Sequence, residues 1–577
     1  MIRKLKYIIP VVIIAMTACK KPLDINVDPN NPTKLSESIL LTGAEKNLSS
    51  CLAAEFGLTQ ILSTYTHQTV VRESPNEYGA TGVDMENNWN TFYISVVTNL
   101  NVIIANGAKD GSFRAVGIAE VLKAYGFSQM VDTYGDIPYS QTAQLLTTGI
   151  RNPAFDKSSA IYPQLLALLD QGIADMAKQP NLSTAAAKTP DPTDVIYTGY
   201  TDLWTKAANS IKLKLLTQQR LTTDVSSQVN ALISGGKLIS NTAESFNFPY
   251  GVNGATDDRN PGYSEYFATQ RTYYTSPWFY SILKGYNPWI YTNISDPRIP
   301  YYFFNQIGPD DQADNPTEFR DGGFVSIYFG SVGPNQGASQ QNSLTVQGIY
   351  PVGGRYDDGN PQTVTATSSN GNAPYKMVTY ADVLYLEAEL MKAGVIAGDA
   401  KSKLQAAMTE SFNQVDYIAG IVSKSAPALA GTDPANNYIT KVLAEYDKYN
   451  GVTIGNITLT KDQQQLESIM TQKWIASFGS SVDAYTDYRR TSFPVMFDPN
   501  NSAMAPNHKV QPPINGDPEN PNAQAPVAVE LIRKYPLSLP WSTSELESNS
   551  KAPAQKTDPS DPKYAPFWYK AGTVPVQ

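Results

Sequence analysis

The chain has 577 residues, more than one compact core accommodates, so several packed units are expected. Its 41% hydrophobic and 17% charged residues are typical of a folded protein with a lightly charged surface. The net charge of −9 argues against a nucleic-acid partner, because phosphate backbones need a basic surface. With two histidines, two cysteines and no convincing metal, thiol, Ser-His or phosphate-loop motif, most catalytic schemes are also disfavoured.

The first 21 residues, MIRKLKYIIPVVIIAMTACKK, predict a lipoprotein signal peptide. A basic start precedes an apolar run of about ten residues, which suits a signal peptide and is too short to span a bilayer. The small residues before Cys19 resemble a bacterial lipobox, which implies that Cys19 becomes the lipidated first residue. We therefore expect a signal peptide over 1–18, a lipidated Pro/Asn-rich tether over 19–34 and a folded body over 35–577.

Apolar residues recur at helical spacing in both halves of the body and predict a mainly α fold. The segments are Phe113 to Met130, Ile161 to Met176, Trp204 to Leu215, Val378 to Ala388, Lys401 to Val415 and Leu466 to Phe478. On the third of these, Lys206, Lys212 and Lys214 are expected to face solvent.

Residues 241–375 differ from both halves. Gly, Pro, Asn, Asp and aromatic residues dominate there, and helical periodicity is poor. We expect a helical scaffold over 35–240, a loop-rich aromatic insertion over 241–375, and a helical and loop region over 376–577. Binding residues often lie on loops that a rigid scaffold carries.

The most aromatic part of the insertion is 271–291, RTYYTSPWFYSILKGYNPWIY, in which eight of 21 residues are Tyr, Trp or Phe. Exposed rings stack on the C–H faces of sugars while polar side chains bind the hydroxyl edges. The candidate ligand platform comprises Trp278, Trp289, Tyr273, Tyr274 and Tyr286. The polar loop 72–89 adds Tyr78 and Arg72. The alternative is a short buried helix, and Phe279, Ile282 and Leu283 are expected to point inward in either case.

Four blocks in chain order resemble the SusD/RagB family of outer-membrane lipoproteins, and particularly its SusD-like branch. They are DINVDPNNP at 24–32, DTYGDIPY at 132–139, YADVLYLEAE at 380–389, and QKWIA at 472–476 followed by YRRTSFP at 488–494. The charged residues of the last two blocks, Glu387, Glu389, Arg489 and Arg490, are interpreted as scaffold.

This resemblance implies a scaffold of tetratricopeptide-like helix pairs carrying irregular loops. It also implies a lipid-anchored position on the outer membrane, facing the cell surface, beside a SusC-like TonB-dependent transporter. There the protein would capture a glycan and deliver it to the transporter, without catalysis and without a cofactor.

Two alternatives remain open. A relative in the same family and role could bind a peptide or another nutrient. A helical glycoside hydrolase would need two carboxylates facing each other across a cleft. Adjacent acids such as Asp310-Asp311 and Asp357-Asp358 are more typical of turns, and no calcium-loop pattern supports a structural Ca²⁺.

Overall fold

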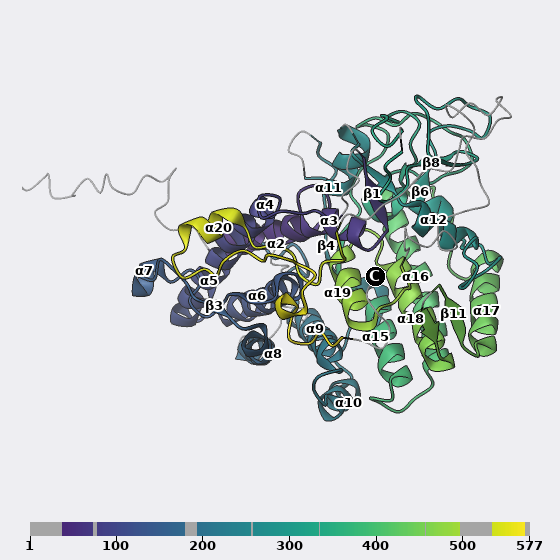
Figure 1. The fold of residues 1–577 in the computed structure, drawn as a ribbon. Helices are drawn as coiled ribbons and strands as arrows, with labels where there is room; N and C mark the ends of the chain where they lie inside the picture. Colours follow the sequence, from purple (N-terminus) through teal and green to yellow (C-terminus); the bar gives the residue numbers. More distant parts are fainter. Residues whose placement is uncertain are drawn as a thin grey trace, which may run out of the picture.

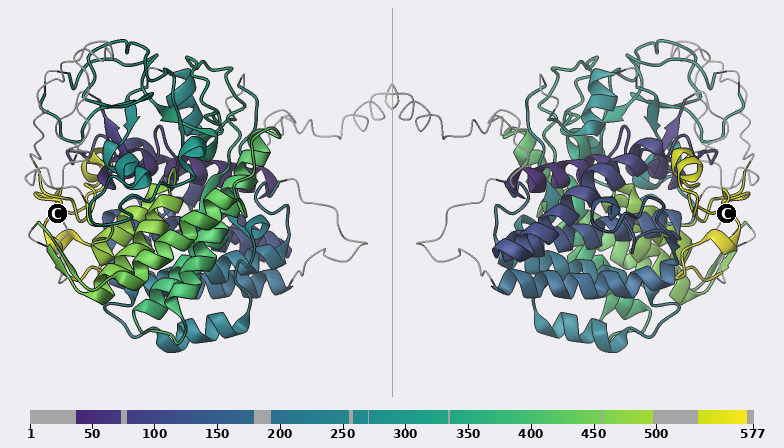
Figure 2. Two further views of the ribbon diagram at one scale, coloured as in Figure 1. Left: turned by 90° about the vertical axis from the view of Figure 1, so that its right-hand side faces the viewer. Right: turned by 90° about the vertical axis from the view of Figure 1, so that its left-hand side faces the viewer.

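The computed structural model shows a mainly helical molecule, as the sequence predicts (Figure 1). The structure describes residues 37–72, 78–178, 193–254, 258–269, 271–333, 335–455, 457–496 and 533–571. Cys19, the signal peptide and the tether lie outside these residues. Helices fill one end of the molecule and loops with short strands the other, as two side views show (Figure 2).

The first half of the scaffold is built from helices that pack on their neighbours in sequence. They are α2 (Glu37–Leu52), α3 (Leu58–Tyr65), α4 (Glu86–Asn90), the π-helix η1 (Thr91–Val97), α5 (Thr98–Asp110), α6 (Phe113–Tyr134), α7 (Leu145–Thr148), α8 (Ser158–Lys178), α9 (Thr201–Gln219) and α10 (Ser226–Gly235). Helix α6 packs against α5, α8 and α9 and is buried over most of its length.

The stretch Glu86–Lys109, which joins α4, η1 and α5, is long and apolar enough to cross a membrane by length and composition. In this fold it packs against α2 and α6, and 33% of its apolar window is buried.

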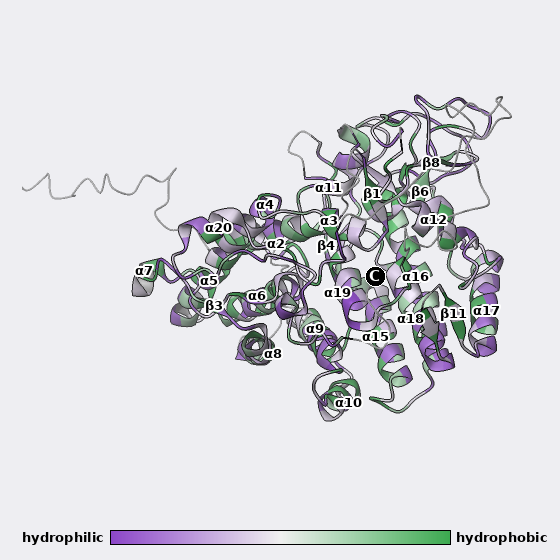
Figure 3. Cartoon of the chain, in the orientation of Figure 1, coloured by the Kyte–Doolittle hydropathy of each residue, from purple (hydrophilic) through white to green (hydrophobic). Residues whose placement is uncertain are grey.

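The second half repeats the pairing of helices. Its helices are α15 (Tyr380–Lys392), α16 (Ala400–Val422), α17 (Asp433–Lys448), α18 (Lys461–Ala476), α19 (Ser481–Thr491) and the short α20 (Thr543–Ser548). Helix α15 begins with a capping box in which Thr379 and Asp382 satisfy each other's backbone amides. It then packs between α16 and α18 and also contacts α9, which joins the two halves. Along their length the helices carry both hydrophilic and hydrophobic residues (Figure 3).

The loop-rich section between the halves holds short helices and two-stranded antiparallel sheets, drawn in teal in Figure 1. The helices are η2 (Thr242–Glu244), α11 (Pro261–Tyr263), η3 (Ser264–Ala268), α12 (Pro277–Lys284), α13 (Ile299–Tyr302) and α14 (Ile349–Val352). The strand pairs are β1 (Thr69–Val71) with β5 (Tyr273–Thr275), β4 (Phe246–Phe248) with β10 (Tyr375–Val378), β6 (Phe303–Phe304) with β9 (Val346–Gln347), and β7 (Phe319–Asp321) with β8 (Phe324–Ser326). Outside this section β2 (Ile137–Pro138) pairs with β3 (Phe155–Asp156), β11 (Val452–Ile454) pairs with β12 (Ile457–Leu459), and η6 (Pro562–Tyr564) lies near the end.

Two buried cations fasten the loop-rich section to the scaffold. Arg298 is paired with Asp296 and donates to Ser411 of α16 at 2.9 Å and to Gln472 of α18 at 3.0 Å. Lys376 of β10 donates to the carbonyls of Ala476 and Phe478, and burial lowers its pKa to about 7. The loops are therefore attached to helix ends by hydrogen bonds that leave these buried groups satisfied.

One prediction about the scaffold is wrong. Lys214 does not face solvent but is 3% exposed and pairs with Asp483 of α19 at 2.5 Å. Periodicity within α9 identifies the side that faces α6 and α8, but α19 comes from 270 residues further along the chain and covers a second side. Lys206 and Lys212 are half-buried and pair with Glu244 and Asp170.

Candidate functional site

The aromatic stretch 271–291 folds into three parts that face different ways. Residues Tyr273–Thr275 form β5, residues Pro277–Lys284 form α12, and the rest is loop. The side chain of Ser276 caps α12 by accepting from the amide of Trp278 at 3.2 Å, and Pro277 occupies the first turn. Because a strand and a helix place their side chains at different angles, the eight rings do not form one flat platform.

The candidate ligand residues divide by exposure. Tyr274, Trp278 and Tyr78 are 0%, 3% and 5% exposed, so their rings lie in the interior. Phe279, Ile282 and Leu283 are buried, as predicted. The half-buried candidates, which present part of their surface, are Tyr273, Tyr286, Trp289 and Arg72.

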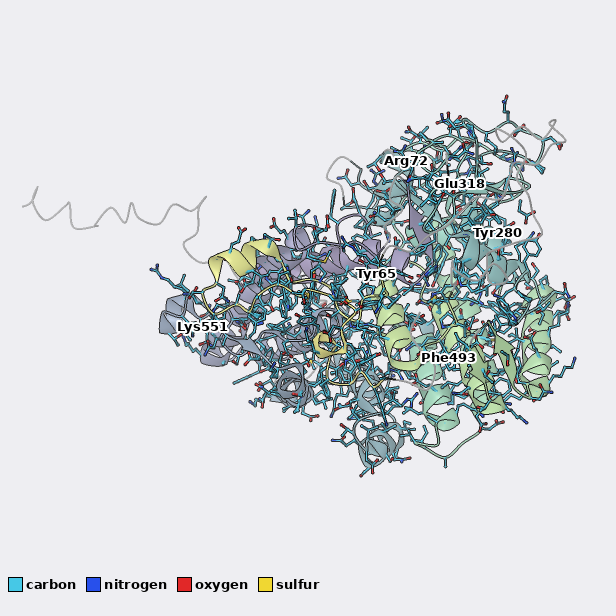
Figure 4. All side chains as sticks on the ribbon, viewed as in Figure 1. Tyr65, Arg72, Tyr280, Glu318, Phe493 and Lys551 are labelled. Carbon is cyan, nitrogen blue, oxygen red and sulfur yellow. The ribbon has the colours of Figure 1, made fainter. Side chains whose placement is uncertain are left out.

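The half-buried candidates lie in two places. Tyr286 and Tyr280 both donate to Asp321 of β7 at 2.8 Å, which places Tyr286 beside α12. Tyr273 instead lines a pocket to which Tyr65 of α3 also contributes. Figure 4 labels Tyr65 and Tyr280 and shows them well apart. Tyr286 and Trp289 belong to the loop that follows α12 and, unlike Tyr273, are not among the lining residues of this pocket.

The pocket beside Tyr273 has a volume of about 400 Å³, and we call it the Tyr273 pocket. Its walls come from the turn between α2 and α3, from α3 itself, from residues 79–88 and from β1 and β5. Three aromatic side chains border it, namely Phe56, Tyr65 and Tyr273. Loops carried on a helical scaffold therefore meet at one open hollow.

Phe56 is 69% exposed, which is unusual for so large an apolar side chain. It lies between Glu55, whose φ of 69° is left-handed, and Gly57. A Cβ at Gly57 would lie 2.3 Å from the carbonyl oxygen of Ala53, so this position needs glycine. The amide of Glu55 donates to Gln60 Oε1 at 2.6 Å and fixes the turn that holds the ring outward.

Polar groups surround these rings. The side chain of Gln60, whose Oε1 accepts from the amide of Glu55, lines the pocket. Asp84 Oδ2 accepts from both the amide and the hydroxyl of Thr81 at 2.7 Å, and Asn87 is exposed on the same wall. The pocket thus offers ring faces beside amide and carboxylate edges.

The scaffold holds the pocket walls directly. Gln68 Nε2 donates to the carbonyl of Trp474 at 2.7 Å, and Trp474 Nε1 donates to the carbonyl of Thr66 at 2.9 Å. Ser481 of α19 donates to Gln68 Oε1 at 2.6 Å. The turn between α3 and β1 is thereby attached to α18 and α19 on both sides.

Tyr65 is packed edge-on against Tyr78, with ring centroids 5.3 Å apart, and its hydroxyl accepts from the amide of Ala80 at 3.2 Å. Burial raises the pKa of the Tyr65 hydroxyl far above its usual range, so it stays protonated. Tyr78 in turn bonds to His67 at 2.8 Å, and burial lowers the pKa of His67 to about 3. This layer behind the pocket is neutral and rigid.

The charged residues of the last two family-like blocks are buried in the scaffold, as predicted. Glu389 is 0% exposed and bonds to Arg490 and, at 2.7 Å, to Arg220. Arg489 donates to the carbonyls of Leu537 and Asp132. Glu387 pairs with Lys403. These side chains are far from free to bind a ligand.

No cluster of three or more metal-ligating side chains occurs among the residues that the structure describes. Asp311 accepts from the amide of Gly308, Asp357 from that of Gly359 and Asp358 from that of Asn360. These acids stabilise turns, which agrees with their interpretation from sequence.

Sequence reasoning missed Phe56, Glu55 and Gln60. A single Phe between two helices gives no periodic signal, and its exposure depends on the turn conformation. Asp84 and Asn87, which line the pocket, lie inside the polar loop 72–89 that composition had singled out as a candidate. Residues 73–77 of that loop lie outside the described part of the chain.

The architecture is shared with solved structures of helical SusD-type proteins. A SusD/RagB family protein from Bacteroides thetaiotaomicron is 18% identical, with a TM-score of 0.60, and the match covers 90% of this chain and 95% of that one. A SusD homolog from Bacteroides uniformis is also 18% identical, with a TM-score of 0.60 and coverage of 92% and 99%. A chitin-binding protein is 17% identical, with a TM-score of 0.59 and coverage of 89% and 95%.

A family model for SusD-like proteins, described as starch-binding and associating with the outer membrane, matches residues 29–514. The chain belongs to this SusD-like family. A comparison with curated proteins found no significant match.

Proposed function

We propose that this protein is a glycan-capture lipoprotein of the cell surface, and that the Tyr273 pocket is where it binds. The observation that carries the proposal is the combination of Phe56 and Tyr273 rings with polar groups such as Gln60 and Asn87 around one hollow. Sugar rings need such faces and edges together. An affinity of about 1 µM to 1 mM is expected, because ordering and desolvation offset a few stacked rings.

The test is electrophoresis of the purified protein through gels that contain starch, hydroxyethyl cellulose or glycol chitin. We expect retardation by one polysaccharide, and loss of roughly fivefold in affinity in each of Phe56→Ala and Tyr273→Ala, since one stacked ring is worth about 1 kcal/mol. Ile94→Ala is the matched control, because Ile94 is 66% exposed on η1, outside the pocket. Unchanged retardation in both pocket variants would place the site elsewhere. Tyr286→Ala and Trp289→Ala would then test the two half-buried aromatic candidates on the loop after α12.

The anchor and the partner are part of the same proposal. Lipidation at Cys19 would hold the protein at the outer membrane, and a SusC-like TonB-dependent transporter would receive the glycan. Cys19→Ala is expected to move the protein from the membrane fraction to the soluble fraction. Protease added to intact cells should degrade the wild type if it faces outward. Co-purification of a transporter with the wild type, extracted in mild detergent, would test the partnership.

The proposal also states that the protein binds the glycan without cleaving it. Glu55 and Asp84 both line the pocket, so hydrolysis must be tested directly. We expect the chain length of the bound polysaccharide to stay constant over a long incubation. Shortening that is lost in Glu55→Gln or Asp84→Asn would identify a glycoside hydrolase instead.

A further inference from the structure

Beyond the presence of a glycan site, we propose that the Tyr273 pocket selects neutral or cationic glycans and rejects those that carry carboxylate or sulfate groups. This inference rests on the proposed glycan-binding function. Glu55 and Asp84 line the pocket, and none of its described lining residues is Lys or Arg. The family resemblance alone does not say which glycans bind, and this charge pattern restricts the expected ligands to neutral or cationic glycans.

The two carboxylates reach the pocket from different elements. Glu55 lies in the turn between α2 and α3, where its Oε1 accepts from the hydroxyl of Ser264 at 3.3 Å. Asp84 precedes α4 and is exposed, and the donors on its Oδ2 belong to Thr81. Because the amide and hydroxyl of Thr81 are neutral, they orient Asp84 without cancelling its charge.

Among the described residues, two arginines adjoin the pocket walls. Arg533 is exposed and donates to the carbonyl of Gly79, a wall residue, at 3.1 Å. Arg72 points away and donates to the carbonyl of Gly337 at 3.4 Å. Counted over the described residues, the two lining carboxylates outnumber the one guanidinium at the rim, so the formal charge of the described lining is negative.

A ligand carboxylate held among these groups would be repelled, because like charges a few ångströms apart interact strongly where protein replaces part of the water. An acidic glycan is expected to bind roughly tenfold more weakly than its neutral counterpart. An amino sugar would bind at least as well as the neutral one, since its ammonium group is attracted to the same carboxylates.

Isothermal titration calorimetry with polymers that share a sugar backbone and differ in charge tests this selectivity. Glycol chitin is neutral, glycol chitosan is cationic and carboxymethyl chitin is anionic. Hydroxyethyl cellulose with carboxymethyl cellulose, and starch with carboxymethyl starch, extend the comparison. The protein is the full chain, as wild type and as the Glu55→Gln/Asp84→Asn double variant. The control, Asp202→Asn/Asp433→Asn, removes two exposed carboxylates outside the pocket and changes the net charge equally.

The expected result is a ratio of neutral to anionic affinity of about ten in the wild type, reduced to below three in the double variant and unchanged in the control. If the double variant does not melt cooperatively, Asp84→Asn alone is used and should reduce the ratio by about half. Equal binding of neutral and anionic polymers by the wild type overturns the charge inference and leaves the proposed function intact. An unchanged ratio in a folded double variant does the same. Binding to no polymer in any set overturns the proposed function, and the charge inference with it.

Discussion

At the scale of single residues, a buried carboxylate of the scaffold, Glu389, is held in its ionised form by two arginine partners. Glu389 is fully buried, and burial alone would favour its neutral form. The guanidinium groups of Arg490 and Arg220 outweigh burial and lower the pKa of Glu389 to about 2. A buried carboxylate held by two arginines leaves both of them unsatisfied if it is removed.

Glu389→Gln is therefore expected to lower the free energy of unfolding by about 3–5 kcal/mol, measured by urea denaturation at pH 7. Because the native pKa is depressed, this contribution is present above pH 4.5 and is lost as the pH falls toward 2. Asp462→Asn is the control. Asp462 bonds to Lys392 at 2.6 Å but its side chain is 83% exposed, so a loss below about 1 kcal/mol is expected. Equal losses in the two variants would refute this account.

Glu467 of α18 is a buried carboxyl whose pKa is raised instead of lowered. Burial raises the pKa of Glu467 to about 7. The hydrogen bond from the amide of Val495 lowers this pKa, and the negative charge of Glu445 raises it further. Below pH 4.5 the side chain is protonated in both the native and the unfolded state, so it has no pH-dependent effect there. Between pH 4.5 and 7 the unfolded state loses this proton while the native state keeps it, so stability falls until the native side chain ionises as well.

Glu467→Gln should therefore become more stable than the wild type as the pH rises. The difference is expected to grow from pH 5 and level off near pH 8 at about 3 kcal/mol. Urea denaturation at four pH values measures it, with Glu547→Gln, an exposed position, as the control. A difference that does not change with pH would show that Glu467 ionises normally.

At the scale of elements, the crossing of α6 and α8 depends on two glycines. A Cβ on Gly117 would lie 2.4 Å from the carbonyl oxygen of Gly172, and one on Gly172 would lie 2.9 Å from that of Gly117. The backbones touch there, so the close approach excludes any larger residue. Helix propensity, which favours alanine, acts in the opposite direction.

Gly117→Ala is expected to destabilise the protein by more than about 2 kcal/mol, because two packed helices must separate. Gly420→Ala, within α16 and with no atom within 4 Å of the new Cβ, should instead stabilise it by up to about 1 kcal/mol. Thermal melts of the two variants measure the contrast. Stabilisation by both substitutions would mean that the crossing is looser than described.

The helices could be predicted from the sequence, and the strand pairing could not. The helical stripes predicted between Phe113 and Met130 and between Lys401 and Val415 correspond to α6 and α16 and extend a few residues further in each case. Helices are local, so their period is visible in the chain. The pairing of β1 with β5 joins residues about 200 positions apart, and each strand has three residues, too few for a pattern. The pocket brings together Val71 of β1 and Tyr273 of β5. The sequence singled out the segments 72–89 and 271–291 as candidates, but not the contribution of residues 55–65.

At the scale of the whole molecule, one hydrophobic core runs through both halves and the loop-rich section. Leu48 of α2, Phe279 of α12 and Trp474 of α18 belong to it. The rings of Phe279 and Trp474 meet at 4.9 Å, edge to face. Loops that share a core with the scaffold should not unfold before it does.

We expect a single thermal transition in which near-ultraviolet and far-ultraviolet circular dichroism report the same midpoint. The near-ultraviolet signal follows the aromatic loops and the far-ultraviolet signal follows the helices. Loss of the near-ultraviolet signal several degrees earlier would show that the loop-rich section unfolds independently.

The hydrogen bonds that join Thr66 and Gln68 to Trp474 and Ser481 affect the rates at which a ligand associates and dissociates. A hollow whose walls are already in place needs no rearrangement before a ligand enters, so association at about 10⁶ M⁻¹s⁻¹ is reasonable. With a dissociation constant of about 100 µM, the complex would then last about 10 ms. Under the proposed function, the protein would bind and release its glycan many times a second near the membrane, and the transporter that receives the glycan would set the direction of transport.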